Sequence, residues 1–504
     1  MLGIRCFQGF IMVLLVVIGQ GCSNGNLASG TVCDGLGKQL IATEVNDILL
    51  KAAASLDSTT MTVAVVDRAG NILGVFRKPG ADPANDDLAV SLARTGAFFS
   101  NNQAPLSSRT VRFISGIHFP PGISFTPNAA LYGIENTNRG CELNATFNPG
   151  KVVPPAKSVN GLPCNSADRS GCGPGITTGK LNFSDSDSSA VNPGGVPIFR
   201  GCTLVGGIGV AGVPGNNAEF AALSGTAGFP PSISPPGVVF IDGVRLPFVE
   251  QTTRPEGTVG DSFPPGGTFM VTPQDGAPPP DGDLVGPQAG SSLTLTEVKL
   301  IVQQSIDAAN RTRAVIRLPV GLRARMAIAV SDTDGTLLAL YRMPDSTIFS
   351  IDVAVAKARN VAYFSSTNPN VTLDLPGIPL GTAVTNRTVS FGSQPLYPPG
   401  IDGTGPGPFA DLFQLDTGTA CSQGHQAQNL NQNGVVFFPG SVPLYKNGIL
   451  VGGLGVSGDG VEQDDYVTFL GASGFEPPDA IRADQIFLLG VRLPFFKFPR
   501  NPEG

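Results

Sequence analysis

The chain reads Met61-Thr-Val-Ala-Val-Val-Asp67-Arg-Ala-Gly70, and the same pattern returns as Met326-Ala-Ile-Ala-Val-Ser-Asp332-Thr-Asp-Gly335. The correspondence continues without a gap to Ser100 and Ser365. Each stretch consists of an apolar run, a turn that contains glycine, and a second apolar run, which is typical of a β-hairpin. The fold is therefore decided by a hairpin that the chain contains twice.

Two later blocks repeat in the same order. Val196-Pro-Ile-Phe199 and Gly206-Gly-Ile-Gly-Val210 return as Val442-Pro-Leu-Tyr445 and Gly452-Gly-Leu-Gly-Val456, and Val-Arg-Leu-Pro-Phe ends both copies, at 244–248 and 491–495. The period of roughly 250 residues is much longer than a solenoid repeat, and each copy is long enough to bury a core. We therefore expect two tandem domains, at 38–250 and 293–498, with a Pro/Gly-rich linker at 251–292.

Composition limits the class of protein. The apolar fraction of 41% supports two real cores, so the 65 glycines and 44 prolines are expected in long ordered loops and in the linker. Charged residues make up only 14% of the chain, and the formal net charge is -7. This balance argues against a protein that binds nucleic acid through its phosphates.

The first 22 residues are typical of an export signal. Arg5 supplies a basic start, an apolar run follows from Phe10 to Ile18, and Gly21 precedes Cys22. A small residue before cysteine resembles a bacterial lipoprotein signal, which predicts a lipid on Cys22, membrane attachment through that lipid, and a periplasmic or cell-surface location. An ordinary secreted signal is the alternative. No later segment is long and apolar enough to span a membrane.

The remaining cysteines number six, and an exported protein with an even number of cysteines is expected to form disulfides. Cys164 and Cys172 are a plausible local pair, but the connectivity stays open. Only Cys421 lies in the second copy, so any bridge that it forms must cross between the copies. The six positions are Cys33, Cys141, Cys164, Cys172, Cys202 and Cys421.

The order of elements indicates the fold class. Apolar stripes predict helices at 40–55 and 294–309, and Ala-rich helices follow the hairpins at 87–99 and 352–364. Thr294 and Glu297 form a capping box, whereas Ile41 at the matching place predicts a frayed start. Because helices are few and hairpins are local, we expect an α+β fold with mainly antiparallel sheets. Long Gly/Pro-rich loops occupy 124–190 and 402–434.

Both copies contain G-x-G-x-x-G, at 207–212 and 453–458. A dinucleotide site needs this turn inside a βαβ unit, with an acidic residue at the end of the next strand. Neither copy has that context, so the glycines are interpreted as allowing a strand to pack tightly against a helix. A smaller possibility is an anion at the N-terminus of the helix that follows.

The shared basic residues are the candidates for ligand binding. Guanidinium groups bind carboxylates, such as haem propionates, through two parallel hydrogen bonds. The structural alternative is an ion pair with Asp67 or Asp332, which are otherwise interpreted as turn-forming residues. The candidates are Arg77, Arg94, Arg342, Lys357 and Arg359.

The chain has two histidines, His118 and His425, and the copies do not share them. Either is chemically suited to bind iron or another metal, but a solvated loop histidine is the simpler interpretation. The sequence offers no nucleophile and base constellation, and no G-x-S-x-G elbow. An enzyme is therefore the least supported class.

Together these motifs resemble the GlcG/HbpS-like haem-binding domain. The resemblance rests on Ala64-Val-Val-Asp67 with Arg77, on Ala356-Lys-Ala-Arg359, and on Phe438-Pro-Gly-Ser-Val-Pro443. It implies a profilin/PAS-like α+β fold, a haem pocket near the five basic residues, and self-association, either as a homo-oligomer or as an intramolecular pseudo-dimer. It implies no fixed iron ligand.

The first copy departs from the family pattern. Leu92 replaces Lys357, and Asn217-Ala218 replaces Gln463-Asp464. The function expected is an exported, lipid-anchored tandem haem binder or sensor without catalysis. The alternative is a structural or interaction module of the cell envelope whose ligand site has degenerated.

Overall fold

The computed structural model describes residues 39–114, six residues between 131 and 141 (131, 133, 134, 137, 138 and 141), 193–231, 238–241, 244–399, 401, 403–419 and 421–504. The predicted signal segment with Cys22 lies outside the described residues, as do His118, Cys33, Cys164 and Cys172.

The first copy has the predicted order of a helix, a hairpin, an Ala-rich helix, and a closing strand pair with a helix. Its elements are α1 (Ala42–Ala54), β1 (Thr62–Asp67), β2 (Ile72–Arg77), α2 (Ala84–Phe99), α3 (Ser108–Ile114), β3 (Gly195–Arg200), β4 (Thr203–Ala211), α5 (Gly215–Gly225), β5 (Phe240–Ile241) and β6 (Val244–Arg245).

The second copy repeats this order and adds short helices in its long loop. Its elements are α6 (Leu295–Arg311), β9 (Ala327–Ser331), β10 (Leu337–Arg342), α7 (Phe349–Phe364), α8 (Val371–Asp374), α9 (Asn386–Gly392), α10 (Ala410–Gly418), β11 (Ser441–Lys446), β12 (Ile449–Ser457), α11 (Val461–Gly471), 3-10 turns at Asp479–Ile481 and Ala483–Gln485, β13 (Phe487–Leu488) and β14 (Val491–Arg492).

Within the described residues, each copy forms a five-stranded sheet, and the two sheets have the same topology. The strand orders are β3-β4-β1-β2-β7 and β11-β12-β9-β10-β8, in which every neighbouring pair is antiparallel. The predicted α+β class with mainly antiparallel sheets is therefore confirmed.

The fifth strand of each sheet comes from the segment that joins the copies. β7 (Thr268–Val271) pairs with β2, and β8 (Gly282–Val285) pairs with β10. The same segment caps α1, because the Asp275 carboxylate accepts a hydrogen bond of 2.7 Å from the amide of Ala42. The start of α1, predicted to fray at Ile41, thus takes its cap from a residue more than two hundred positions away. The connecting segment is built into both domains.

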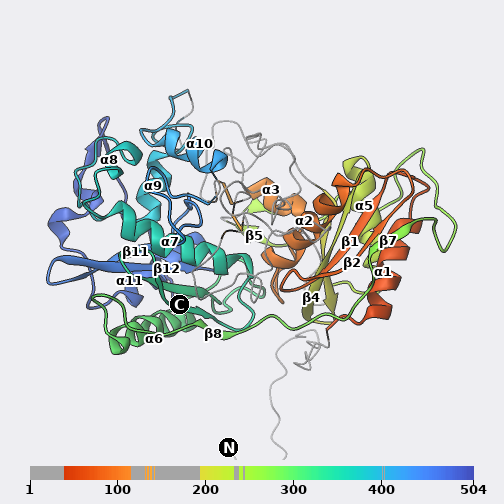
Figure 1. Cartoon of the computed structure of the whole chain (residues 1–504), viewed down its shortest axis with the longest axis horizontal. Coiled ribbons are helices and arrows are strands. Elements are labelled where there is room, and N and C mark those ends of the chain that lie inside the picture. The colour runs from red at the N-terminus through yellow and green to blue at the C-terminus, as the bar shows by residue number, and fades with distance from the viewer. Residues whose placement is uncertain are drawn as a thin grey trace, which may run out of the picture.

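Helices cover both faces of each sheet, as Figure 1 shows. In the first copy, α1 and α5 lie on one face and α2 on the other. The alternation of β1 explains this layering, because Val63 and Val65 pack toward α1 while Ala64 and Val66 pack toward α2. The second copy uses α6, α11 and α7 in the same places.

The glycine motifs lie in β4 and β12, except for Gly212 and Gly458, which directly follow these strands, and this corrects their predicted place in turns. A Cβ atom on Gly207 would lie 2.1 Å from the carbonyl oxygen of Ala93, and one on Gly453 would lie 2.1 Å from that of Ala358. Any side chain at these positions would collide with the helix backbone. The interpretation of a strand packed closely against a helix is confirmed.

The two copies share a hydrophobic core. Phe99 at the end of α2 stacks on Phe349 at the start of α7, with ring centroids 4.3 Å apart. The amide of Ile348 also donates to the carbonyl oxygen of Phe98 at 3.1 Å. Phe364 aligns with Phe99, and Ala84 aligns with Phe349. If a two-fold axis related the copies, these two residues would make the same contact, but Ala84 is exposed. The copies therefore form an intramolecular pair whose contacts join non-equivalent ends.

Candidate functional site

Arg94 and Arg359 make the same internal contact in both copies. The Nε of Arg94 donates to the carbonyl oxygen of Gly70 at 3.0 Å, and that of Arg359 donates to Gly335 at 2.9 Å. Both guanidinium groups are buried, and burial lowers the pKa of Arg94 to about 10 and that of Arg359 to about 9. These arginines tie the Ala-rich helix to the hairpin turn.

Arg77 and Arg342 also form internal ion pairs, but not with the predicted partners. Arg77 pairs with Asp86 at the start of α2, with a distance of 3.0 Å from Nε to Oδ1. Arg342 pairs with Asp281 of the connecting segment, with a distance of 2.5 Å from Nη1 to Oδ1. The proposed pairing with Asp67 or Asp332 is wrong.

The two hairpin aspartates act as turn-forming residues, as predicted. The Oδ1 of Asp67 accepts from the amide of Asn71 at 2.9 Å, and the Oδ1 of Asp332 accepts from the amide of Thr333 at 2.7 Å. Each carboxylate also holds the connecting segment, because Asp67 accepts from Ala277 and Asp332 from Ser291. Their acceptor capacity is therefore used by backbone amides, which leaves the hairpin arginines to other partners.

Lys357 forms a buried ion pair on the inner face of the second copy. Its Nζ lies 3.0 Å from the Oδ2 of Asp464 and 2.8 Å from the carbonyl oxygen of Val456. Burial raises the pKa of Asp464 to about 7, although the lysine opposes this shift. Burial likewise lowers the pKa of Lys357. The five predicted basic residues therefore do not converge on one pocket, and each is occupied by protein groups.

A small apolar cavity of about 80 Å³ lies between the copies, beside this ion pair. Both copies contribute side chains, and Phe99 and Phe349 form part of its wall. Asp464 lines it on the side of the second copy. The other lining residues are Leu106, Ile114, Leu131, Ile134 and Ile241 from the first copy, and Val315, Ile316, Phe438, Ser457, Gly458, Gly460, Val461, Glu462 and Gln463 from the second.

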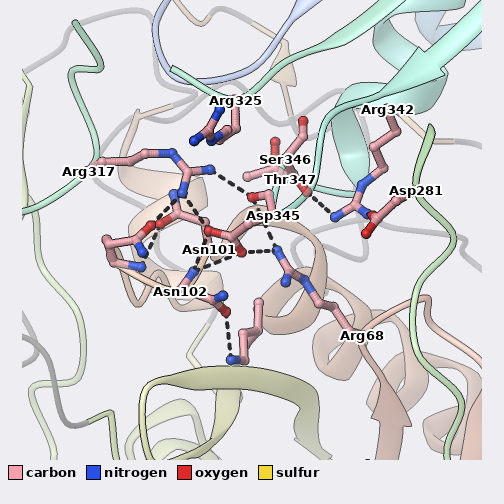
Figure 2. Close-up of polar contacts among 12 residues, drawn as sticks. Arg68, Asn101, Asn102, Asp281, Arg317, Arg325, Arg342, Asp345, Ser346 and Thr347 are labelled. Atoms are coloured by element: carbon pink, nitrogen blue, oxygen red, sulfur yellow. Dashed lines mark hydrogen bonds and ion pairs between the residues drawn. The ribbon is translucent and has the colours of Figure 1, made fainter. Parts of the chain in front are cut away.

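A polar cluster centred on Asp345 holds the copies together, as Figure 2 shows. Its carboxylate accepts from Arg68 at 2.6 Å, from Arg317 at 2.5 Å, and from the amide of Asn102 at 3.2 Å. Burial raises the pKa of Asp345, but Arg68 and Arg317 outweigh it, so the net pKa is lowered. The carboxylate stays ionised and fixes the hairpin of one copy against the other.

A disulfide between Cys141 and Cys421 also joins the copies. The expectation that a bridge from Cys421 must cross between them is confirmed. Close to it in the chain, the amide of Asn138 donates to the Oδ2 of Asp352 at 2.8 Å. Asn138 is thus held at the start of α7.

A larger pocket lies on the second copy, and the sequence reasoning missed it. Its volume is about 620 Å³, and its wall combines five phenylalanine rings with five charged side chains. The run Phe495-Phe-Lys-Phe498 was the signal, but the sequence analysis used only 491–495, as the end of the repeat. The described lining residues are Phe391, Val442, Phe469, Ala472, Glu476, Pro477, Asp479, Arg482, Asp484, Arg492, Leu493, Pro494, Phe495, Phe496 and Phe498.

Arginine sits at this aromatic pocket. The guanidinium carbon of Arg482 lies 4.6 Å from the ring centroid of Phe495, and its Nη2 lies 2.8 Å from the carboxylate of Asp484. Arg492 contacts the same carboxylate at 3.5 Å and is more than half exposed. Arg482 also contacts the carboxylate of Asp479 at 3.0 Å, so it is paired with two acids, and Arg492 is the more exposed of the two arginines.

The first copy has a pocket in the corresponding place, with a volume of about 300 Å³. Val196 and Phe248 line it where Val442 and Phe495 line the larger one. Leu223 stands in the position of Phe469, and the described lining holds no charged residue. The fold therefore provides this pocket twice, with different chemistry.

His425 lies on a loop of the second copy, about half exposed, with its Nδ1 2.8 Å from the carboxylate of Asp374. Among the described residues, no group of three His, Cys, Asp or Glu side chains has the arrangement of a metal site. Within the same residues no helix has the length and apolar character needed to cross a membrane.

Comparison with known proteins gives one family. The family described as haem degrading protein HbpS-like matches residues 39–227 and 293–472, which is well over half of the chain. Among curated proteins, the corrinoid adenosyltransferase PduO of Salmonella typhimurium is 28% identical over 153 residues, which are 30% of this chain and 33% of that protein. The match therefore spans about a third of the relative's length.

Solved structures also resemble the chain. One is a PduOC–heme complex, with 21% identity, a TM-score of 0.24, and coverage of 36% of this chain and 94% of that one. Another is a double mutant of HbpS from Streptomyces reticuli, with 22% identity, a TM-score of 0.19, and coverage of 41% of this chain and 97% of that one.

Proposed function

The chain belongs to the HbpS-like family of haem degrading proteins, and we propose that it is an exported, lipid-anchored protein that binds haem without catalysing a reaction. Family membership supports haem as the ligand. The basic and apolar segment that ends at Cys22 supports export and lipid attachment.

Haem does not fit the neighbourhood predicted from sequence. The cavity beside Lys357 and Asp464 has about 80 Å³, whereas a cavity of roughly 150 Å³ holds a single benzene. All five predicted residues also donate to protein groups, so a propionate would have to displace an existing partner. The proposal therefore does not use that cavity.

The aromatic pocket of the second copy suits a flat macrocycle, and this observation carries the proposal. Its volume of about 620 Å³ lies within the usual range for ligand pockets. Phe469, Phe496 and Phe498 supply aromatic rings for stacking, and Arg492, which is more than half exposed, supplies a guanidinium group for a propionate.

The pocket supplies no obvious iron ligand. Its described lining contains no His, Cys, Met or Tyr, so the chain's part is to shield the ring and to hold its carboxylates. Bound haem itself supplies the iron and the absorption band by which binding is followed. A pocket that shields the ring and holds its carboxylates suits a carrier or a sensor rather than an enzyme.

The test is a haem titration of the full chain, followed by absorbance. We expect the haem band to shift with an end point near one haem per chain. The variant Phe469→Ala/Phe496→Ala should abolish the shift, and the matched variant Leu223→Ala/Val249→Ala in the first copy should leave it unchanged. An unshifted spectrum on titration of the natural chain would refute the proposal.

A structural or interaction module of the cell envelope is the second candidate. The observation that favours it is that the two copies are tied by a disulfide, a shared core and the Asp345 cluster, which suits a rigid module. A native chain that assembles with partners or with itself, and that carries no small molecule in native mass spectrometry, would select this candidate.

A further inference from the structure

The second copy joins its first helix to its first strand through a segment that is rich in arginine. Residues 312–326 connect α6 to β9, whereas residues 55–61 make the same connection in the first copy. The first connection contains no arginine, so the fold itself does not require arginine here. With the last residue of α6 included, the arginines of the second connection are Arg311, Arg313, Arg317, Arg323 and Arg325.

The two arms of this segment form a short ribbon with arginine on one face. Arg313 and Arg323 are antiparallel partners, so their side chains leave the ribbon on the same side, although like charges in this position repel. Arg325 follows by alternation, and its Nη1 donates to the side-chain oxygen of Asn310 at 2.9 Å. The residues between the arginines point inward and are buried, namely Thr312, Ala314, Ala324 and Met326.

The groups that hold the ribbon arginines are mainly uncharged. Arg313 donates to the carbonyl oxygens of Asn501 at 3.0 Å and Arg500 at 2.9 Å. Arg323 donates to the carbonyl oxygen of Glu503 at 3.1 Å. A carbonyl oxygen fixes the direction of a guanidinium group but does not cancel its charge. The C-terminal segment also adds the exposed side chain of Arg500 to this side of the copy.

In the described part of the chain, the carboxylate of Glu503 is the one acid paired with these guanidinium groups. It lies 3.3 Å from the Nε of Arg311, and both side chains are well exposed, at 39% and 52%. Water screens a pair this exposed, so a strong excess of positive charge remains on this surface. We name it the arginine face, and its members are Arg311, Arg313, Arg323, Arg325 and Arg500.

An exposed apolar side chain lies at the tip of the same segment. Val320 is 82% exposed, between the partly exposed Leu318 and Leu322. It precedes Arg323 by three residues, so the chain keeps the two within roughly 11 Å of each other. Basic residues beside an exposed apolar one are typical of a surface that lies on an anionic bilayer. An acidic protein would match the charge alone and would not account for the apolar tip.

From these observations we propose that the arginine face, together with Val320, docks on the surface of an anionic lipid bilayer. The guanidinium groups bind the lipid phosphates, for which their paired donors are suited, and Val320 enters the apolar boundary below them. The surface belongs to the second copy alone. It depends neither on the proposed haem function nor on the predicted lipid at Cys22.

The test is flotation of the full chain with vesicles of phosphatidylcholine alone, or of phosphatidylcholine and phosphatidylglycerol in equal parts. Every protein carries Cys22→Ser, so that no lipid on this residue contributes. We expect binding to the anionic vesicles to be tighter by about ten-fold or more, and the difference to shrink as salt is added. Equal binding to the two kinds of vesicle would overturn the proposal.

A matched pair of variants separates charge from structure. Arg313→Gln/Arg323→Gln and Arg313→Lys/Arg323→Lys both lose the guanidinium bonds to the C-terminal segment, but only the first pair loses charge. Each basic residue near an anionic surface contributes about a five-fold factor, so the glutamine variant should bind about 25-fold more weakly. The lysine variant should stay within about three-fold of the natural chain. Equal losses in the two variants would contradict the proposal.

The apolar tip has its own control. Val320→Ser should weaken binding to the anionic vesicles by about five-fold, because it removes the apolar contact with the bilayer. Val259→Ser changes a valine of the connecting segment that is 59% exposed, and it should leave binding unchanged. An equal effect of the two substitutions would count against the proposed orientation on the bilayer. A failed haem titration would leave all of these results unaffected.

Discussion

The inner faces of the two copies differ in one matched pair of positions. The second copy buries the ion pair of Lys357 and Asp464, and the first copy buries Leu92 and Ala218 in the same place. Both scaffolds keep the same strand order. A buried ion pair is weak evidence for stability, since well-packed apolar residues often replace it at no cost. The difference shows that the scaffold forms without this pair.

Both copies also have an outer pocket, but the residues that line the two pockets differ. In the second copy Phe469, Arg482 and Arg492 line about 620 Å³, and in the first copy Leu223 and prolines line about 300 Å³. By contrast, Arg94 and Arg359 make the same bond in both copies. We therefore assign the contacts that both copies share to the scaffold, and the positions at which the copies differ to the candidate sites.

The largest effect should follow from breaking the ion pair on one side. Asp464→Ala leaves the ammonium group of Lys357 buried without its carboxylate, and we expect a loss of about 3–5 kcal/mol in the free energy of unfolding. The double variant Lys357→Leu/Asp464→Ala should lie within about 1 kcal/mol of the natural chain. Urea denaturation measures both, and equal losses in the single and double variants would contradict the comparison.

Removal of the disulfide between the copies should also lower the stability. Cys141→Ser/Cys421→Ser removes a bridge between residues 280 positions apart, and the typical cost of losing such a constraint is about 2–4 kcal/mol. Hydrogen exchange should localise the loss to the face between the copies. Unchanged protection at that face would mean that the Asp345 cluster and the shared core suffice to hold it.

The shared arginines should respond alike. Arg94→Met and Arg359→Met each remove the bond to a turn carbonyl, and we expect each to lower the stability by about 1–3 kcal/mol. Because both are assigned to the scaffold, neither should alter the haem titration by more than a small factor. A selective loss of haem binding in Arg359→Met, with stability intact, would restore the site predicted from sequence.

The stability of the chain should also depend on pH. Burial raises the pKa of Asp464 from its ordinary value of 3.8 to about 7, so the folded chain binds a proton more tightly than the unfolded chain does. This contribution to stability is complete below about pH 4 and is lost as the pH rises through about 7. Denaturation at pH 4 and pH 8 should show this decline in the natural chain. The decline should be weaker in Lys357→Leu/Asp464→Ala, and an identical pH dependence in both proteins would contradict the assignment.

Sequence reasoning predicts the local parts of this fold well. The hairpins, the Ala-rich helices and the closing strands follow from apolar periodicity and from the repeat, and the glycines of β4 and β12 show the close helix contact. The sequence pattern does not predict the edge strands β7 and β8, because strands this short show little apolar periodicity among prolines and glycines. The segment 251–292 was therefore interpreted as a linker only.

The site was harder to predict because its partners are distant in sequence. The repeat aligns Arg342 with Arg77 and Arg359 with Arg94. Nothing in the neighbouring sequence indicates that Arg342 pairs with Asp281 or that Arg359 donates to Gly335. The replacement of Lys357 and Asp464 in the first copy was visible in the sequence, yet only the fold shows that the two residues touch. The aromatic pocket needs residues from β11, α9, α11 and the C-terminal segment together.

The central claim is that the second copy binds the ligand in its aromatic pocket while the first copy serves as scaffold. Native mass spectrometry of the haem-loaded full chain tests it most directly. The account predicts one haem per chain, lost in Phe469→Ala/Phe496→Ala and retained in Leu223→Ala/Val249→Ala. Two haems per chain, or loss of haem only when the first copy is changed, would contradict it.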